Sequence, residues 1–344
     1  MVLTLDDTKR TAIASKLADM KALQNLLIEN EQKLIAAIDD PEISKRLRDF
    51  LQDDQKNMGV LDTVIVQYGV KGEPKESMMK VVEQARQMMD SSEFTIFEKV
   101  GQHELLKHKQ TMAGLLVHKA GQVVGADIEA AIAPLNTVNF ENRAHQEQLK
   151  GVLEILGVRE LTGKDPDQGL WGRVQDAVAA LTGVAGSVVT QSTDKQDMNI
   201  QDVIRLDHNK VNTLFAEVEA TDDPQKLQEY FGQIYKDLTA HSIAEEQVVY
   251  PAVRPYYSNT QELYDEQAEL KQLLESTRSL SPSSSEFKNQ IRRIRDMVMD
   301  HVRQEESEMF AKIRDNFSTE QSEQMATRFK QAKSQVQDEM KVSN

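Results

Sequence analysis

One phrase occurs twice in the chain, as HSIAEEQVVYP at 241–251 and as HVRQEESEMFA at 301–311. In each copy a histidine and a glutamate stand four residues apart, so that the two side chains share one face of an α-helix. Apolar residues continue both faces, at positions 234, 238, 244 and 248 and at positions 294, 297, 298 and 309. The spacing therefore predicts two helices that each point a histidine and a glutamate into a helical core.

A third histidine has the same surroundings. His208 lies at the centre of an apolar helical stripe formed by Ile204, Val211 and Phe215. We therefore expect three helices of one bundle to point a histidine inward, and two of them to add a carboxylate.

Two glutamates in an apolar interior need a compensating charge. An unpaired buried carboxylate costs several kcal/mol, and the nearby cations Lys210 and Arg303 lie off the inward faces. A divalent cation would compensate Glu245 and Glu305. Imidazole and carboxylate together suit Fe, Mn or Zn, and the chain has no cysteine that could supply a thiolate. The sequence therefore predicts a metal site among these residues.

The composition favours helices, because the 344 residues include only 15 Gly and 8 Pro and are rich in helix formers. We expect an all-α fold of two four-helix bundles in tandem. Residues 1–157 would form the first bundle, 158–198 a linker with a short amphipathic helix at 169–189, and 199–344 the metal-binding bundle. The expected helices are 6–39, 41–68, 76–120 and 126–156, then 199–219, 224–250, 259–277 and 286–316, with an appended helix at 318–340.

The charge balance is acidic. Lys and Arg number 41 against 56 Asp and Glu, a net charge of −15. This excess argues against nucleic acid or an anionic membrane as a partner. The start, MVLTLDDTKR, lacks the features of a signal peptide, and no run of about 18 apolar residues predicts a transmembrane segment. We expect a cytoplasmic protein.

Residues 199–316 resemble the hemerythrin HHE cation-binding family, whose four-helix bundles hold a non-haem dinuclear site. The resemblance rests on RLDHNKV at 205–211 and on the two phrases above. It implies an up-down-up-down bundle that binds two non-haem Fe ions, with Mn or Zn as alternatives. The ligands that it implies are His208, His241, Glu245, His301 and Glu305.

The third helix of this bundle departs from the family pattern, which has a histidine there. The sequence LYDEQAELKQLLE at 263–275 places Gln267 at that position, and leucines flank both Gln267 and Glu266. We favour Glu266 as a replacement oxygen ligand, with Gln267 donating to it or to a bound water, and an open coordination position as the alternative. Tyr250 and Phe310, which end the two phrases, are interpreted as core-closing residues, with a redox role for Tyr250 left open.

The first half of the chain, residues 6–156, weakly resembles ferritin-like bundles in layout. Such bundles bind two metal ions through a glutamate on each of two helices and Glu-x-x-His on each of the other two. Here Glu104 and His108, like Glu141 and His145, are spaced by four, and the first two helices have no histidine. We therefore do not expect an intact metal site in this half.

The hemerythrin resemblance implies binding of dioxygen, peroxide or a similar small molecule, in sensing, storage or protection against oxidative stress. The alternatives are a diiron or dimanganese oxidoreductase of the peroxidase or oxidase type, and a scaffold held together by its metal. Enzymatic activity, catalytic residues and a homodimer are left open.

Overall fold

The computed structural model describes residues 7–166 and 198–342, and every regular element within these two ranges is a helix. The predicted all-α fold is therefore confirmed. The amphipathic helix expected at 169–189 lies outside the described residues. Among the described helices, none is both long and apolar enough to cross a membrane.

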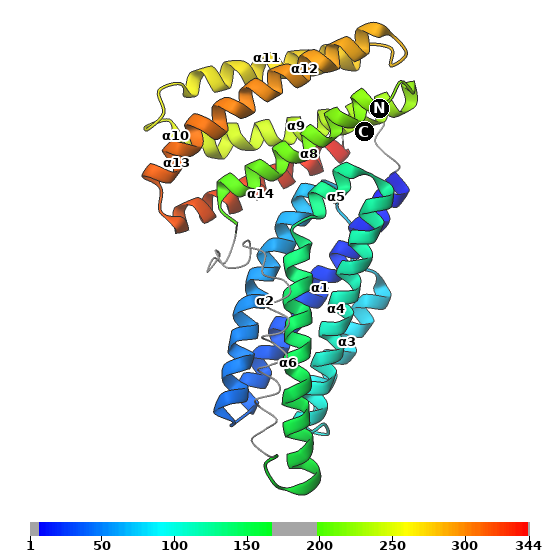
Figure 1. Cartoon of the computed structure of the whole chain (residues 1–344), viewed down its shortest axis with the longest axis vertical. Helices are drawn as coiled ribbons and strands as arrows, with labels where there is room; N and C mark the ends of the chain where they lie inside the picture. Colours follow the sequence, from blue (N-terminus) through cyan, green and yellow to red (C-terminus); the bar gives the residue numbers. More distant parts are fainter. Residues whose placement is uncertain (1–6, 167–197, 343–344) are drawn as a thin grey trace.

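The N-terminal bundle is built from four long helices and two short ones (Figure 1). The long helices are α1 (Asp7–Ala37), α2 (Pro41–Tyr68), α4 (Ile96–Val124) and α6 (Leu135–Thr162). The short ones are α3 (Glu76–Asp90), which packs against α1, and α5 (Ala126–Ile132).

Two of the expected helices are interrupted, which corrects their predicted ranges of 76–120 and 126–156. The first is broken before α4, because Thr95 forms a capping box with Glu98 and so starts a new helix. The second is broken at Ala133 and Pro134, because a proline cannot donate the backbone hydrogen bond of a helix interior.

The C-terminal bundle also has four long helices, and two of them continue through irregular turns. The first and third are α8 (Ile200–Ala220) and α11 (Thr260–Arg278). The second continues from α9 (Pro224–Ala244) through η1 (Glu245–Val249) into α10 (Tyr250–Val253), and the fourth from α12 (Ser285–Gln304) through η2 (Glu305–Met309) into α13 (Phe310–Asn316).

The last helix, α14 (Thr319–Val342), is more than an appendage, because it packs against α8, α9 and η1 and also touches α2. Met325, Ala326 and Phe329 on its inner face are almost fully buried. The C-terminal bundle with α14 lies across one end of the N-terminal bundle (Figure 1).

Specific contacts join the two bundles where α2 ends. Gly69, in the left-handed conformation (φ 77°), terminates α2 and exposes the last carbonyl groups. Lys210 of α8 is 2% exposed, and its ammonium donates to the Gln67 carbonyl at 2.8 Å and to Asp237 at 3.0 Å. The Gln67 amide in turn donates to the Val203 carbonyl at 3.1 Å. A cation at the negative end of a helix is electrostatically favourable.

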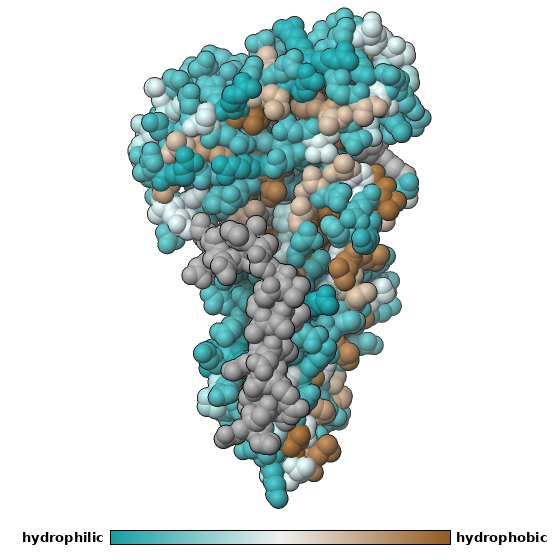
Figure 2. Space-filling model, viewed as in Figure 1, coloured by the Kyte–Doolittle hydropathy of each residue, from teal (hydrophilic) through white to brown (hydrophobic). Residues whose placement is uncertain are grey.

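Each bundle has a polar layer between apolar clusters. In the C-terminal bundle, His208, His241 and His301 separate a cluster around Tyr250 and Phe310 from another around Phe231 and Phe287. Outside, the surface is mostly hydrophilic, and apolar residues gather along one edge of the N-terminal bundle (Figure 2). The large apolar residues that α4 exposes are Leu105, Met112, Leu115, Leu116 and Val123.

Candidate metal centre

Five side chains from three continuous helical segments converge in the polar layer of the C-terminal bundle. His208 comes from α8, His241 and Glu245 from the α9–η1 segment, and His301 and Glu305 from the α12–η2 segment. The histidines are 5–6% exposed and the two glutamates are fully buried. The structure therefore places all five sequence-predicted residues on the inward faces that their spacing predicted.

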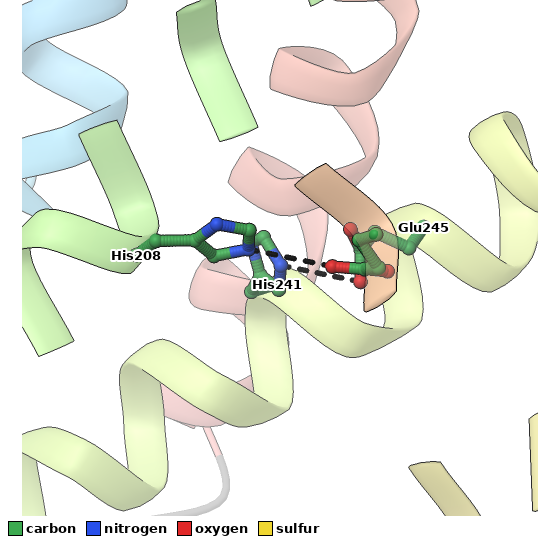
Figure 3. Close-up of side chains that lie close together, drawn as sticks. His208, His241 and Glu245 are labelled. Atoms are coloured by element: carbon green, nitrogen blue, oxygen red, sulfur yellow. Dashed lines mark ion pairs between the residues drawn. The ribbon is translucent and has the colours of Figure 1, made fainter. Parts of the chain in front are cut away.

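The inner nitrogen of each histidine faces one of the two glutamates. His241 Nε2 lies 3.2 Å from Glu245, while His208 Nε2 and His301 Nε2 lie 3.4 and 3.3 Å from opposite oxygens of Glu305. Figure 3 shows the rings of His208 and His241 and the carboxylate of Glu245 lying close together. Ligand atoms of His208, His241, Glu245 and Glu305 all lie within 4.8 Å of one another. One cation could contact all four.

A π-helical turn begins at each glutamate. In η1 the backbone N–H of Tyr250 bonds to the Glu245 carbonyl, and in η2 that of Phe310 bonds to the Glu305 carbonyl. Such wide turns inside α-helices are rare and are frequently found at functional sites. The extra residue in the turn changes the face on which the following residues lie, so that α-helical spacing does not predict their positions.

The outer ring nitrogen, Nδ1, of each histidine also contacts a carboxylate. Nδ1 of His208 lies 2.8 Å from Glu306, that of His241 lies 2.9 Å from Asp207, and that of His301 lies 2.5 Å from Glu266. A carboxylate on one ring nitrogen fixes the orientation of the ring and leaves the other nitrogen for a cation. Glu306 and Asp207 are residues that the sequence analysis did not assign to the site.

The third helix presents Gln267 to the centre, while Glu266 bonds to the outer side of His301. The Gln267 amide donates to Glu245 and to the Tyr250 hydroxyl, both at 3.0 Å. Glu266 is about one-third exposed, on the outer nitrogen of His301. The sequence favours Glu266 as the inward oxygen ligand, and the structure instead brings Gln267 to that position. The ligand role of either residue remains a prediction.

Tyr250 lies at the centre of the site as well. Its hydroxyl donates to Glu305 at 2.8 Å and lies 3.1 Å from His301 Nε2. The side chain is fully buried. The sequence placed Tyr250 beyond the site, as a core-closing residue, because the π-helical turn that redirects it leaves no mark in the pattern of apolar residues.

The cluster is strongly coupled electrostatically. Burial opposes protonation of the histidines, but Glu245 and Asp207 raise the pKa of His241 to about 10, and Glu305 and Glu266 raise that of His301 to about 11. Burial and the neighbouring Glu305 also raise the pKa of Glu245. Protons therefore compensate the carboxylates when no cation does so.

The residues fit a bound cation. His208 Nε2, Glu245 Oε1 and Glu305 Oε2 are buried and make no hydrogen bond, although His208 Nε2 and Glu305 Oε2 lie 3.4 Å apart as an ion pair. Buried polar atoms are normally paired, so unpaired ones in a native structure require an explanation. All three belong to residues that face the same point, and imidazole nitrogen with carboxylate oxygen is a donor set that suits Fe, Mn and Zn. A metal ion would pair all three atoms.

The fold and the site define a hemerythrin-like cation-binding bundle. The Hemerythrin HHE cation binding domain family matches residues 199–313, which confirms the resemblance of the C-terminal half. An uncharacterised hemerythrin-like protein of Schizosaccharomyces pombe is 25% identical over 139 residues, 39% of this chain and 68% of that protein. No solved structure matches the chain.

A more similar relative spans both bundles. A protein of Nostoc sp. (strain PCC 7120) named DNA nickase is 67% identical over 339 residues, which cover 98% of this chain and 97% of that protein. The chain belongs to the same family as this Nostoc protein. The name contradicts our expectation that nucleic acid is not a partner, which rested on the net charge of −15.

Proposed function

We propose that this chain is a metal-dependent DNA nickase whose cation is held by the hemerythrin-like bundle. The relative named DNA nickase supports action on DNA, because the similarity extends over nearly the whole length of both chains. The observation that carries the metal dependence is the buried cluster of His208, His241, Glu245 and Glu305, which contains nitrogen and oxygen atoms that make no hydrogen bond.

Two sets of residues would hold the cation, the inner ligands and the carboxylates on the outer side of the rings. Nε2 of His208 and His241 and the carboxylates of Glu245 and Glu305 would bind one cation, with His301 Nε2 beside Glu305 as a further donor. The outer carboxylates would keep the rings oriented. Bound there, a transition metal supplies Lewis acidity or redox capacity. The two apolar clusters on either side of the polar layer keep bulk water away from these side chains.

The burial of the site favours a second candidate function, in which the metal serves dioxygen or peroxide. With the histidines 5–6% exposed and the glutamates fully buried, the inner ligand atoms are too enclosed for contact with a DNA strand, whereas dioxygen and peroxide are much smaller. Nicking would then depend on the centre without direct contact between the metal and the phosphodiester.

Conversion of supercoiled plasmid into open circles tests the proposal. We expect His241→Ala/His301→Ala to lose metal and nicking activity together. The control is His108→Ala/His118→Ala, which removes two histidines outside the cluster and should keep both. Nicking by the first variant at the rate of the unaltered protein would refute a role for the metal site.

Removing dioxygen and peroxide from the nicking assay distinguishes the two candidate functions. Hydrolytic nicking should continue without dioxygen or peroxide and should leave ends that DNA ligase reseals. Oxidative chemistry at the metal should stop under these conditions, and the ends formed in air should resist resealing. A chain that nicks no DNA but changes its visible absorption reversibly with dioxygen would favour the second candidate alone.

A further inference from the structure

The polar layer of the N-terminal bundle is centred on a buried lysine. Lys107 of α4 is fully buried. Its ammonium lies 3.1 Å from Glu31 Oε1 of α1, bonds to Asp54 of α2 and lies 3.0 Å from His145 Nδ1 of α6. An ammonium has three N–H donors, and here each of the three other long helices supplies one acceptor.

The surroundings of this ammonium are those that metal ions prefer. His103 Nε2 lies 3.2 Å from the Glu31 oxygen that also faces Lys107, and His145 Nδ1 lies 3.7 Å from Asp54. Glu31, Asp54 and His103 are fully buried, and each has one polar side-chain atom that makes no hydrogen bond, Glu31 Oε2, Asp54 Oδ1 and His103 Nδ1. Two imidazoles and two carboxylates around one point form a donor set for a divalent transition metal.

We propose that this cluster is a second cation site, in which the ammonium of Lys107 is the resident cation and excludes a metal ion. Shortening the lysine side chain would open the position to a divalent transition metal bound by Glu31, Asp54, His103 and His145. The inference goes beyond the proposed function, because none of these residues belongs to the C-terminal centre.

The charge balance supports a cation at this point. Burial lowers the pKa of Lys107, but Asp54 and Glu31 outweigh it and raise that pKa above the ordinary value, so the ammonium stays charged. Removing one partner of a buried ion pair is strongly destabilising, since the other charge is left without compensation. A bundle that loses the ammonium must compensate Asp54 in another way, and the four remaining side chains can bind a metal cation there.

The ligand atoms are not preassembled around an empty point, which is consistent with a lysine that fills the position. Among the described residues, histidine and acidic side chains bring ligand atoms close enough together to hold a metal ion in the C-terminal bundle alone. We therefore expect the unaltered N-terminal bundle to bind no transition metal.

The test uses the full chain carrying His241→Ala and His301→Ala, so that any tight site lies outside the C-terminal cluster. Adding Lys107→Ala should create binding of about one Co²⁺ per chain, seen as d–d absorption and as a rise of the unfolding temperature with Co²⁺ concentration. Lys109→Ala, which removes an exposed lysine two residues further along α4, is the matched control and should show neither effect.

Lys107→Met distinguishes a metal site from a general stability effect. Methionine removes the charge and fills the space, so this variant should be destabilised like Lys107→Ala but should not be rescued by Co²⁺. If Lys107→Ala fails to fold alone, Co²⁺ present during refolding should restore its helical circular dichroism. Absence of that rescue, or equal stabilisation of the alanine and methionine variants by Co²⁺, would overturn the inference.

Discussion

Among single residues, Tyr250 connects the metal site with the apolar core. Its hydroxyl, which has one proton to donate, lies 2.8 Å from Glu305 and 3.2 Å from Glu245 and accepts from Gln267, and its ring packs edge-on against Tyr264. In the metal-free protein the phenol is therefore one of the few neutral donors available to two buried carboxylates.

Tyr250→Phe should consequently destabilise the metal-free protein more than the metal-loaded one. Without a cation, Glu305 loses a buried donor, which costs about 1–3 kcal/mol. With a cation bound, the carboxylates are compensated and the loss is smaller. Thermal unfolding of both forms measures the difference, and an equal decrease in the two unfolding temperatures would show that the hydroxyl does not contribute to charge compensation.

A second residue, Glu141 on α6, gives a prediction about pH. Burial and the nearby Asp53 raise the pKa of Glu141 to about 7, above its ordinary value of 4.5. A carboxyl whose pKa is raised by folding stabilises the protein below pH 4.5, and this contribution is lost as the pH rises to about 7. Other groups that face it or its neighbours are Asp54 and Asn57 on α2 and His145 on α6.

Glu141→Gln should therefore become more stable relative to the unaltered protein as the pH rises from 4.5 to 7, by up to about 3 kcal/mol. Urea unfolding at several pH values measures this trend. Glu154→Gln, which changes an exposed glutamate of the same helix, should follow the unaltered protein at every pH. A constant difference between Glu141→Gln and the unaltered protein would contradict the raised pKa.

Helical spacing predicted the inward direction of His208 and of both His–Glu pairs, because apolar neighbours fix the buried face of a helix. It could not choose between Glu266 and Gln267, since leucines flank both residues and the choice depends on how α11 is rotated in the bundle. Lys107 was not recognised, because a lysine in a long helix looks like a surface residue until its three acceptors on other helices are known.

Among the helices, α14 differs most from its predicted role. Its sequence is polar, so we expected an appended helix, but Lys330 and Lys333 face inward and are 7% and 1% exposed. Lys333 bonds to Asp207, which bonds to Nδ1 of His241 at 2.9 Å. Although burial opposes it, Lys333 and His241 hold the pKa of Asp207 well below its usual range. The helix therefore supports a predicted metal ligand through one intervening carboxylate.

Lys333→Met should weaken metal binding about tenfold, as expected for loss of an outer group that orients a ligand. Lys330→Met is a closely matched control, because Lys330 is also a buried lysine of α14 but donates to Thr63 of α2. Competition with a chelator of known affinity measures both variants. Equal metal affinities for Lys333→Met and Lys330→Met would contradict a specific role of Lys333 in orienting His241.

For the whole molecule, the acidic composition led to the wrong expectation about nucleic acid. A net charge of −15 sums over both bundles, while a contact with DNA involves only the groups at the contact. The sum weakens non-specific attraction to phosphates and so affects affinity and salt dependence. It does not decide whether a protein acts on DNA. The predicted domain boundaries at residues 157 and 198 remain a prediction, because contacts between the two bundles join them.

From these shared contacts we predict that metal binding in the C-terminal bundle also stabilises the packing near the end of α2 in the N-terminal bundle. Lys333, which supports His241 through Asp207, also lies 3.5 Å from the side-chain oxygen of Gln67 near the end of α2. If the metal orders His241 and Asp207, linkage requires that the packing against Gln67 is strengthened as well.

Amide hydrogen exchange of metal-loaded and chelator-treated protein should then differ at residues 61–68 as well as along α9. Residues 41–50, at the opposite end of α2, provide the internal control and should exchange equally in both forms. A change confined to the C-terminal bundle would show that the contacts between the bundles hold them together without transmitting the state of the metal site.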